Sequence, residues 1–424
     1  MPAGDAINAS RAFSREMEAV IAHTRATPRG TPALETKRGQ YAGETPQLRT
    51  LLWRRSREGG LVCSAIVPPG MGASATRAFS CAGDVGGRRA LLACSAVALG
   101  LLGHRLACAW ATRRRLSLLS GAYSKRAVLI TGCDTGLGFS LALRAHDLGL
   151  WVFATCLRGE GAGARRLREM SPRMQVLQMD VTDGQSVFAA RDSVVRQLKR
   201  NNLELGALVN NAAVMVFGEF EWQTERLIKF QTDVNLLGTF RVTKAFCPEL
   251  RKSKGRIITV SSHCAQATLP GLAVYGATKA GIEAWSDGLR MELQKYGINV
   301  ITVLPGSFSQ RSNIGGQQGE FAAEMRAAMN QEQKDFYGEY FERYQKYLAA
   351  VFSGRASTLE ALQDPHLYRA FEEALLSQNP RAKYEAPATF RYNLYHFLFK
   401  WSPTTKVHDW LVEKFVQLPK WKVK

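Results

Sequence analysis

Three polar residues in one part of the chain have side chains and spacings suited to proton transfer. Tyr275 and Lys279 stand four positions apart, and residues at this spacing share one face of a helix, which we expect over 278–293. Ser262 closes the β-branched run 255–262, which is typical of a buried parallel strand. Because ligands bind at strand ends in α/β sheets, the three side chains would meet at one site.

The chemistry that this set supports is the exchange of a proton with an alcohol or carbonyl oxygen. A free tyrosine phenol has a pKa of about 10 and is a poor base at neutral pH, but a nearby cation stabilises the phenolate. Lys279 would supply that cation, and Ser262 would hydrogen-bond the same substrate oxygen. The alternative interpretation is that Tyr275 and Lys279 form an ordinary exposed pair on a helix.

Further motifs stand around this set in a fixed order. They are Thr131 to Gly138 (TGCDTGLG), Asn210 to Ala213 (NNAA), Asn235, Ser262, Tyr275, Lys279 and Pro305-Gly306. In this order and spacing the chain resembles the short-chain dehydrogenase/reductases over roughly residues 126–384. The closest resemblance is to the subgroup that contains D-β-hydroxybutyrate dehydrogenase, retinol dehydrogenases, and the type 2 11β- and 17β-hydroxysteroid dehydrogenases.

The resemblance implies a fold and a catalytic set. The fold is a doubly wound, Rossmann-type α/β domain with a mostly parallel seven-stranded sheet. The catalytic residues are Asn235, Ser262, Tyr275 and Lys279, with Asn235, on a helix expected over 227–251, holding a water that links Lys279 to solvent. A buried Asn could instead bond the backbone locally. The helices around Asn235 and Tyr275 form the dimer face of the family, so we expect a homo-oligomer.

A glycine-rich turn predicts a dinucleotide site. The apolar strand 127–130 runs into Gly132, Gly136 and Gly138, which allow a tight turn and a close approach of helix amides to a pyrophosphate. The strand 207–210 then leads into small residues that permit close packing on the nucleotide. The expected cofactor-binding residues are Gly132, Asp134, Thr135, Gly136, Leu137, Gly138, Asp180, Val181, Asn211, Ala212, Tyr275, Lys279, Pro305 and Gly306.

The choice between NAD and NADP depends on the adenosine end of this site. Cys156 stands at the end of strand 151–155, where NAD enzymes of this fold often carry an acid, and Arg158 could contact a 2′-phosphate or lie in solvent. Asp180 is expected to contact the adenine amino group, as in the family, or to serve as the N-cap of a helix over 184–199. We expect NAD as the cofactor, with NADP not excluded.

Helical, aromatic sequence follows the Pro-Gly turn. The helix expected over 336–352 and a second near 359–377 correspond to the substrate lid of the family, and an aromatic lid favours a lipophilic alcohol or ketone. Aromatics at helical spacing could equally form core. A small hydroxy acid would need a cation or amide donors for its carboxylate, for which His263, Gln266 and Arg311 are candidates.

Composition excludes several other classes of function. The chain has 424 residues, of which 46% are hydrophobic and 22% charged, as expected for one large globular domain with extensions. The formal charge of +20 is concentrated at the two ends, and no nucleic-acid-binding motif is present, so we expect no nucleic-acid partner. The eight cysteines show no metal-ligand spacing, so we expect buried thiols and no metal site.

Four regions are expected along the chain. Residues 1–89 are a basic, poorly ordered leader, 90–111 a membrane anchor or the apolar part of a presequence, 124–310 the dehydrogenase domain, and 311–424 the helical lid and C-terminal extension. The segment 90–111 has the length of a membrane span but contains Arg105. A signal anchor, a mitochondrial presequence and a cleaved signal peptide or packed internal segment are the alternatives. We expect a membrane-surface partner, in the endoplasmic reticulum ahead of the mitochondrion, with the Trp- and Lys-rich stretch 390–424 as a second contact.

The sequence therefore predicts an NAD(P)-dependent oxidoreductase that interconverts an alcohol and its carbonyl on a steroid- or retinoid-like substrate. A 3-hydroxybutyrate dehydrogenase is one alternative. The other is a nucleotide-binding scaffold without catalytic activity, because a fold does not guarantee a function.

Overall fold

A computed structural model describes residues 52–55, 61–64, 125–306, 313–352, 359–362, 364–386, 394, 397–399, 401–402, 404–416 and 418–421. The chain divides into two compact units, 1–101 and 102–424. In the first unit, β1 (Leu52–Arg55) pairs antiparallel with β2 (Leu61–Ser64). The segment 90–111, expected to enter a membrane, lies outside the described residues. Among the helices of the described part, none has both the length and the apolarity that a membrane span requires.

The second unit is built on one seven-stranded sheet in which every pairing is parallel. The strands stand in the order β5-β4-β3-β6-β7-β8-β9. They are β3 (Arg126–Ile130), β4 (Trp151–Cys156), β5 (Met174–Gln178), β6 (Glu204–Asn210), β7 (Arg256–Val260), β8 (Asn299–Leu304) and β9 (Lys383–Glu385). The chain reverses its direction of winding between β3 and β6, and this confirms the predicted doubly wound fold.

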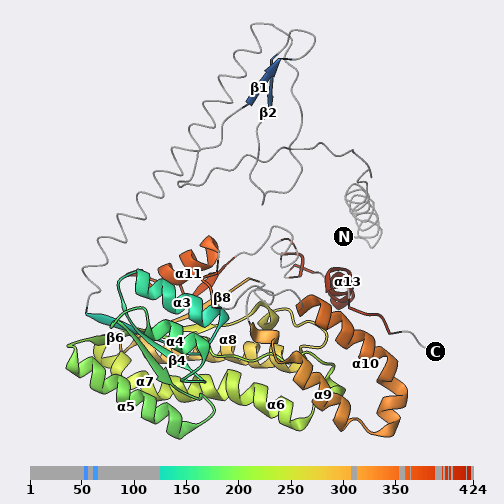
Figure 1. Cartoon of the computed structure of the whole chain (residues 1–424), viewed down its shortest axis with the longest axis horizontal. Helices are drawn as coiled ribbons and strands as arrows, with labels where there is room; N and C mark the ends of the chain where they lie inside the picture. The colour runs from blue at the N-terminus through green and yellow to red at the C-terminus, as the bar shows by residue number, and fades with distance from the viewer. Residues whose placement is uncertain are drawn as a thin grey trace, which may run out of the picture. The chain divides into compact units, whose positions relative to one another are not determined.

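Helices cover both faces of the sheet (Figure 1). Val128 and Ile130 of β3 belong to one core cluster, beneath α3 (Gly136–Asp147), α4 (Ala162–Arg168) and α11 (Pro365–Leu376). Ala127 and Leu129 belong to the other, against α5 (Gly184–Arg200), α7 (Thr239–Ser253) and α8 (Ala273–Gln294). Burial on both faces explains why the strands were apolar at consecutive positions in the sequence.

The helices that carry Asn235 and Tyr275 both differ from the sequence prediction. The helix expected over 227–251 is instead α6 (Glu225–Thr232), a π-helical turn η2 (Asp233–Gly238) and then α7. Such turns widen a helix locally and often occur at functional sites. The helix expected from residue 278 begins earlier, at Ala273, so Tyr275 and Lys279 both lie on α8.

The aromatic region after β8 forms a separate core. It follows η4 (Asn313–Gly315) and contains α9 (Gln318–Ala328) and α10 (Gln331–Phe352). Trp222 of η1 (Phe220–Trp222) makes edge-to-face contacts with rings of α10, at centroid distances of 5.2 to 5.8 Å. These rings are Tyr337, Tyr340, Phe341 and Tyr344. These four rings therefore contribute to a core, the alternative that the spacing allowed, whereas Phe336 on the same helix is 62% exposed. The substrate-lid role of this region stays a prediction.

The end of the chain returns to the sheet. Asp364 caps α11 by accepting hydrogen bonds from two backbone amides, so this helix starts six residues later than the expected position near 359. Arg256, buried on β7, donates to the carbonyl oxygens of Ala374 and Ser377 at the other end of α11. Strand β9 then pairs with β8. A last helix, α13 (Thr405–Val416), packs Leu411 and Val412 near Ala267.

Candidate active site

A cleft of about 1010 Å³ opens at the carboxyl ends of the central strands. Every residue that the sequence assigned to cofactor binding lines this cleft, including the Pro305-Gly306 turn after β8. Ser262, Tyr275 and Lys279 line the same cleft. Asn235 is not among the lining residues, although its neighbour Val234 is.

The glycine turn after β3 has the shape that a pyrophosphate requires. Gly132 has φ +70°, and a Cβ there would come within 2.8 Å of the Cα of Ala212. A Cβ on Gly138 would meet the carbonyl oxygen of Gly132 at 2.1 Å. Thr135 precedes α3 without a side-chain cap, so the first amides of this helix lack a capping side chain beside the cleft. Backbone donors at a helix start favour an anionic ligand, so the turn fits a dinucleotide.

Two polar side chains join the end of β3 to the end of β6. Oγ1 of Thr131 accepts hydrogen bonds from the backbone amides of Asn211 and Ala212, both at 2.9 Å. In return, Nδ2 of Asn211 donates to the carbonyl oxygens of Thr131 and Gly132, at 2.8 and 3.2 Å. This exchange fixes the glycine turn against the small residues that the sequence placed beside the nucleotide.

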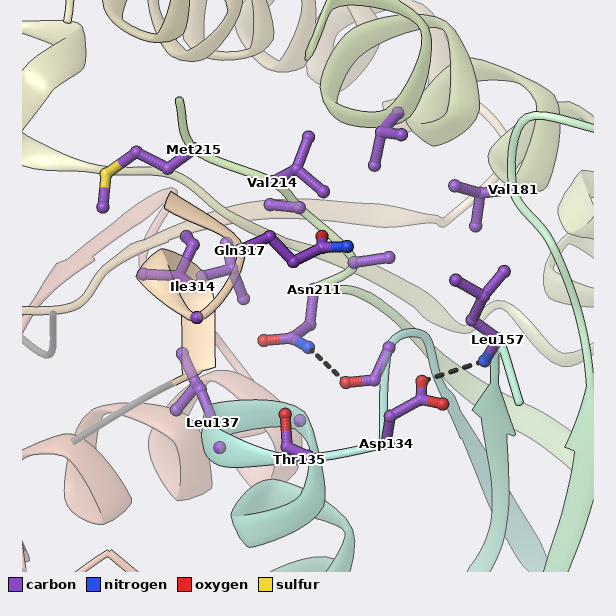
Figure 2. Close-up of a pocket in the computed structure, with 18 of the residues that line it drawn as sticks. Asp134, Thr135, Leu137, Leu157, Val181, Asn211, Val214, Met215, Ile314 and Gln317 are labelled. Carbon is purple, nitrogen blue, oxygen red and sulfur yellow. Dashed lines mark hydrogen bonds between the residues drawn. The ribbon is translucent and has the colours of Figure 1, made fainter. Parts of the chain in front are cut away.

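A carboxylate lies at the adenosine end of the cleft. The two oxygens of Asp134 accept hydrogen bonds from the backbone amides of Leu157 and Arg158, at 2.9 and 3.0 Å. Figure 2 shows the first of these bonds. Cys156, which occupies the usual position of the acid, is fully buried, and burial raises the pKa of its thiol to about 12. An acid of the glycine turn is thus hydrogen-bonded to the backbone that directly follows β4. Arg158 is exposed and lines the same end.

Asp180, the acid after β5, does not cap helix α5, which was one of the two roles that the sequence allowed. Oδ1 of Asp180 accepts hydrogen bonds from the amide and the hydroxyl of Thr182. The N-cap of α5 is Asp183, whose side chain accepts from the amide of Gln185. The N-cap alternative for Asp180 is therefore wrong, because three residues of turn separate it from the helix. Asp180 and Val181 both line the cleft.

Helix α8 presents Tyr275 and Lys279 to the end of β7. The ammonium of Lys279 is buried, donates to the carbonyl oxygen of Val260 at 3.1 Å and lies 5.8 Å from the centre of the Tyr275 ring. Burial lowers the pKa of Lys279 to about 8, so the side chain is still mostly protonated at pH 7. The hydroxyl of Ser262 accepts a hydrogen bond from the amide of Cys264. A phenol, a cation and a hydroxyl thus line one cleft where a strand ends.

Asn235 supports this arrangement from behind the cleft. Its side chain exchanges two hydrogen bonds with the backbone of Val214, at 2.8 and 2.9 Å, and donates to Oγ1 of Thr278 at 3.1 Å. Thr278 in turn donates to the carbonyl oxygen of Tyr275. The described contacts of the Asn235 side chain are therefore structural, but they reach a loop 21 positions away and helix α8, and not the local backbone of the alternative interpretation. Its water-holding role stays a prediction.

The other end of the cleft is apolar. The ring of Tyr275 packs in a cluster with Met215 and Leu272, against which Phe217, Cys264, Leu269 and Ile314 also pack. Among the described residues, the basic side chains that line the whole cleft are Arg158, at the adenosine end, and Lys279. His263 and Gln266, two of the side chains considered for a substrate carboxylate, are not among the lining residues, and Arg311 lies outside the described residues.

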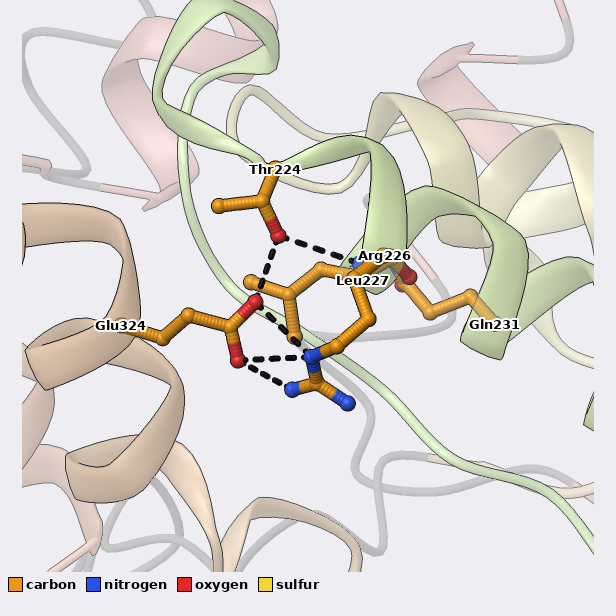
Figure 3. Close-up of polar contacts among 5 residues, drawn as sticks. All are labelled: Thr224, Arg226, Leu227, Gln231 and Glu324. Carbon is orange, nitrogen blue, oxygen red and sulfur yellow. Dashed lines mark hydrogen bonds and ion pairs between the residues drawn. The ribbon is translucent and has the colours of Figure 1, made fainter. Parts of the chain in front are cut away.

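Helix α9 forms one wall of the apolar end and is fastened at two points. The side chain of Gln318, which is buried, exchanges hydrogen bonds with the amide and carbonyl of Phe217 at 2.9 and 2.7 Å. Nearly two turns further on, Glu324 accepts from the hydroxyl of Thr224 and pairs with Arg226 at the start of α6 (Figure 3). Phe321, between them, lines the cleft.

Sequence reasoning missed these wall residues. Loops or helix ends without a motif contain Met215, Phe217 and Leu272. Nothing in the local sequence marks Gln318, because its partner, the backbone of Phe217, lies 101 positions away. Leu359 also lines the cleft, beside Gly163 at the start of α4. The small residues 161–163 were the sequence signal that could have placed this segment beside the glycine turn. A Cβ on Gly163 would meet the carbonyl oxygen of Asp134 at 2.0 Å, so only glycine permits this close approach.

The fold and the site together define a class of dinucleotide-binding α/β proteins with a Ser, Tyr and Lys set at the strand ends. The sequence model of the short chain dehydrogenase family matches residues 126–319. The chain belongs to this family, whose members are oxidoreductases that bind NAD(P). The family prediction made from the motifs is confirmed.

Individual relatives agree with the expected subgroup. The chain is 41% identical over 207 residues to the mitochondrial D-beta-hydroxybutyrate dehydrogenase of Rattus norvegicus, which covers 48% of this chain and 60% of that protein. It is 35% identical over 297 residues to estradiol 17-beta-dehydrogenase 2 of Mus musculus, covering 68% and 74%. A short-chain dehydrogenase crystal structure from Streptomyces avermitilis matches with TM-score 0.50 and 23% identity, covering 69% of this chain and 97% of that one. The alignments with the hydroxybutyrate dehydrogenases span about three fifths of those relatives.

The lowered pKa of Lys279 predicts a pH dependence of dinucleotide binding. An anionic ligand favours the ammonium form, so binding will be linked to proton uptake once the free protein loses that proton. We expect the affinity for NADH to be constant below pH 8 and to fall by up to about tenfold per pH unit above it. Calorimetry at pH 6.5 to 9.5 measures this, with Lys279→Met as the control that should bind weakly and without the break near pH 8. A wild-type affinity that stays constant to pH 9.5 would contradict it.

Proposed function

We propose that this protein is an NAD(P)-dependent dehydrogenase/reductase that interconverts an alcohol and its carbonyl on a lipophilic, steroid- or retinoid-like substrate. The observation that carries the proposal is the position of Tyr275. Its ring is part of the apolar cluster, while Lys279 lies beside it and the glycine turn lines the same cleft. A lipophilic carbinol bound there would bring its oxygen to the phenol.

In the proposed mechanism the dinucleotide, when bound, accepts or gives a hydride. The phenol of Tyr275 takes the proton of the alcohol oxygen during oxidation and returns it during reduction. The ammonium of Lys279, held on the carbonyl of Val260, stabilises the phenolate. Ser262 hydrogen-bonds the same substrate oxygen and positions it. Asn235 fixes the position of α8 relative to the loop at Val214 through its hydrogen bond to Thr278.

Replacing Tyr275 by Phe tests the chemistry, because it removes the oxygen and keeps the volume. We expect turnover to fall by at least about 10²-fold while NADH binding changes little, since general acid–base catalysis contributes 10²- to 10⁴-fold. The assay is a panel of steroids, retinol and 3-hydroxybutyrate with each dinucleotide. Unchanged turnover in Tyr275→Phe with an accepted substrate would refute the mechanism. Binding of NADH without turnover of any compound by the wild type would favour the scaffold alternative.

The charges in the cleft support a neutral substrate over a hydroxy acid. Glu320 lines the cleft from α9, near Phe321, and a carboxylate there opposes an anionic substrate. The similarity to D-beta-hydroxybutyrate dehydrogenases keeps 3-hydroxybutyrate as the second candidate. The panel decides between them, because a hydroxy acid site would prefer 3-hydroxybutyrate to the larger alcohols.

NAD is the proposed cofactor, and Asp134 is the residue that supports it. In this fold the ribose of the adenosine lies at the end of the second strand, which is β4 here. The carboxylate of Asp134 occupies the two amides that follow β4, and its negative charge opposes a 2′-phosphate. The competing feature is Arg158, whose guanidinium could pair with that phosphate.

We expect the wild type to bind NADH more tightly than NADPH, and Asp134→Asn to reduce this preference by about tenfold, because it removes the repulsion between two like charges at a partly exposed position. Calorimetric dissociation constants for both dinucleotides measure it. Arg158→Ala is the matched control and should leave the preference unchanged. Tighter binding of NADPH by the wild type, lost in Arg158→Ala, would show that Arg158 decides the choice instead.

We also propose that the protein lies on a membrane, in the endoplasmic reticulum ahead of the mitochondrion. Apart from the segment 90–111, the support comes from the end of the chain. Phe397, Trp401 and Trp410 are 60, 69 and 44% exposed, and lysines such as Lys406 and Lys414 accompany them. Exposed aromatics beside lysines suit a lipid headgroup layer. Helix α13 packs against Leu269, which lines the cleft, so a substrate in the bilayer would be near the apolar end.

Association of two copies through α7 and α8 also stays a proposal.

Carbonate extraction of membranes tests the anchor. We expect the full-length protein to stay in the pellet, because an inserted apolar segment resists high pH, and a chain beginning at Ser124 to be released. Release of both proteins to the same extent would overturn the anchor and favour a cleaved mitochondrial leader. Immunofluorescence with markers of the two organelles then locates the protein.

A further inference from the structure

A chain of three side chains joins the catalytic strand end to helix α8 and to the last strand of the sheet. Oγ of Ser261, the residue before Ser262, donates to Oε1 of Glu283 at 2.9 Å. Oε2 of the same carboxylate accepts from the ammonium of Lys383, on β9, at 2.7 Å. Ser261 is 2% exposed, and the side chain of Glu283 is 19% exposed.

Glu283 stands one helical turn after Lys279, and this spacing gives the contact its significance. Helix α8 touches the end of β7 at two consecutive residues, through Lys279 at the carbonyl of Val260 and through Glu283 at the hydroxyl of Ser261. The first contact places the cation. The second restrains the backbone that carries Ser262 relative to the helix that carries Tyr275.

We propose that Glu283 is a positioning residue that acts through Ser262, with Ser261 as the link and Lys383 as the group that holds the carboxylate in place. The inference rests on the proposed catalytic role of Ser262. A hydroxyl that must meet one substrate oxygen together with the phenol tolerates little displacement, because misplacement by about 1 Å can cost 10²-fold in rate. The hydrogen bond at residue 261 limits that displacement.

Lys383 stabilises the carboxylate of Glu283 in this position. A carboxylate that is mostly shielded from water is costly unless it is paired, and Lys383 pairs it from an element 100 positions away in sequence. Glutamine at position 283 would keep an oxygen that can accept from Ser261 without needing the ammonium. Alanine would remove both contacts.

The experiment is a set of variants of the full-length protein, measured with a substrate that the wild type accepts. We expect Glu283→Ala and Ser261→Ala each to lower kcat by about tenfold, the double variant to lose no more than either single one, and Glu283→Gln to keep most of the activity. The dissociation constant for NADH should change less than twofold, because the glycine turn is untouched. Glu292→Ala, an exposed carboxylate on the same helix, is the matched control and should leave kcat unchanged.

The same changes in a Ser262→Ala background separate positioning from general destabilisation. If Glu283 acts through Ser262, then Glu283→Ala will cause no further loss of kcat once the hydroxyl is absent. A second, independent tenfold loss in that background would overturn the inference, as would normal kcat in Glu283→Ala. Wild-type turnover in Ser262→Ala alone would instead refute the proposed function. Melting temperatures show which variants fold, and Ser261→Ala, which is expected to show the same loss and the same lack of a further loss in the Ser262→Ala background, carries the test if Glu283→Ala does not fold.

Discussion

Where a parallel strand stops, its last peptide groups lose their neighbours in the sheet, and buried groups of this kind must find other partners. In this protein polar side chains supply them. Asn211 bonds the end of β3, Asn235 the loop after β6, Lys279 the end of β7, and Gln318 the loop at Phe217. The residues that shape the cleft are thus largely the ones that satisfy its backbone, which couples the site to the integrity of the sheet.

The parts of this structure that local rules determine were accessible from the sequence. Consecutive apolar residues predicted the buried strands, and the glycine spacing predicted the turn before α3 because only small residues permit the close approach of Gly138 to Gly132. Ser262, Tyr275 and Lys279 could be assigned to one site because strand ends converge in this topology. The resemblance to a family added the order of these motifs.

Features that depend on contacts across the fold were not accessible. Nothing local distinguishes Asp134 from the other polar residues of its turn until the amides of Leu157 and Arg158 are placed beside it. The π-helical turn contains Asn235, whose side chain is hydrogen-bonded to a loop 21 residues away. The aromatic spacing of α10 is compatible with a lid and with a core, and only the contacts with Trp222 show that four of its rings pack in a core.

The position of β9 in the sheet affects how the chain can reach this state. Its partner β8 ends at Leu304, and β9 begins at Lys383, so roughly 80 residues must be synthesised between them. At 5 to 20 residues per second, β8 is an open edge for about 4 to 16 s after it leaves the ribosome. Open edges of apolar strands invite pairing with other chains. A nascent chain of this protein therefore has a defined period of aggregation risk, which ends when the last strand docks, and chaperones that bind exposed strands would act within that interval.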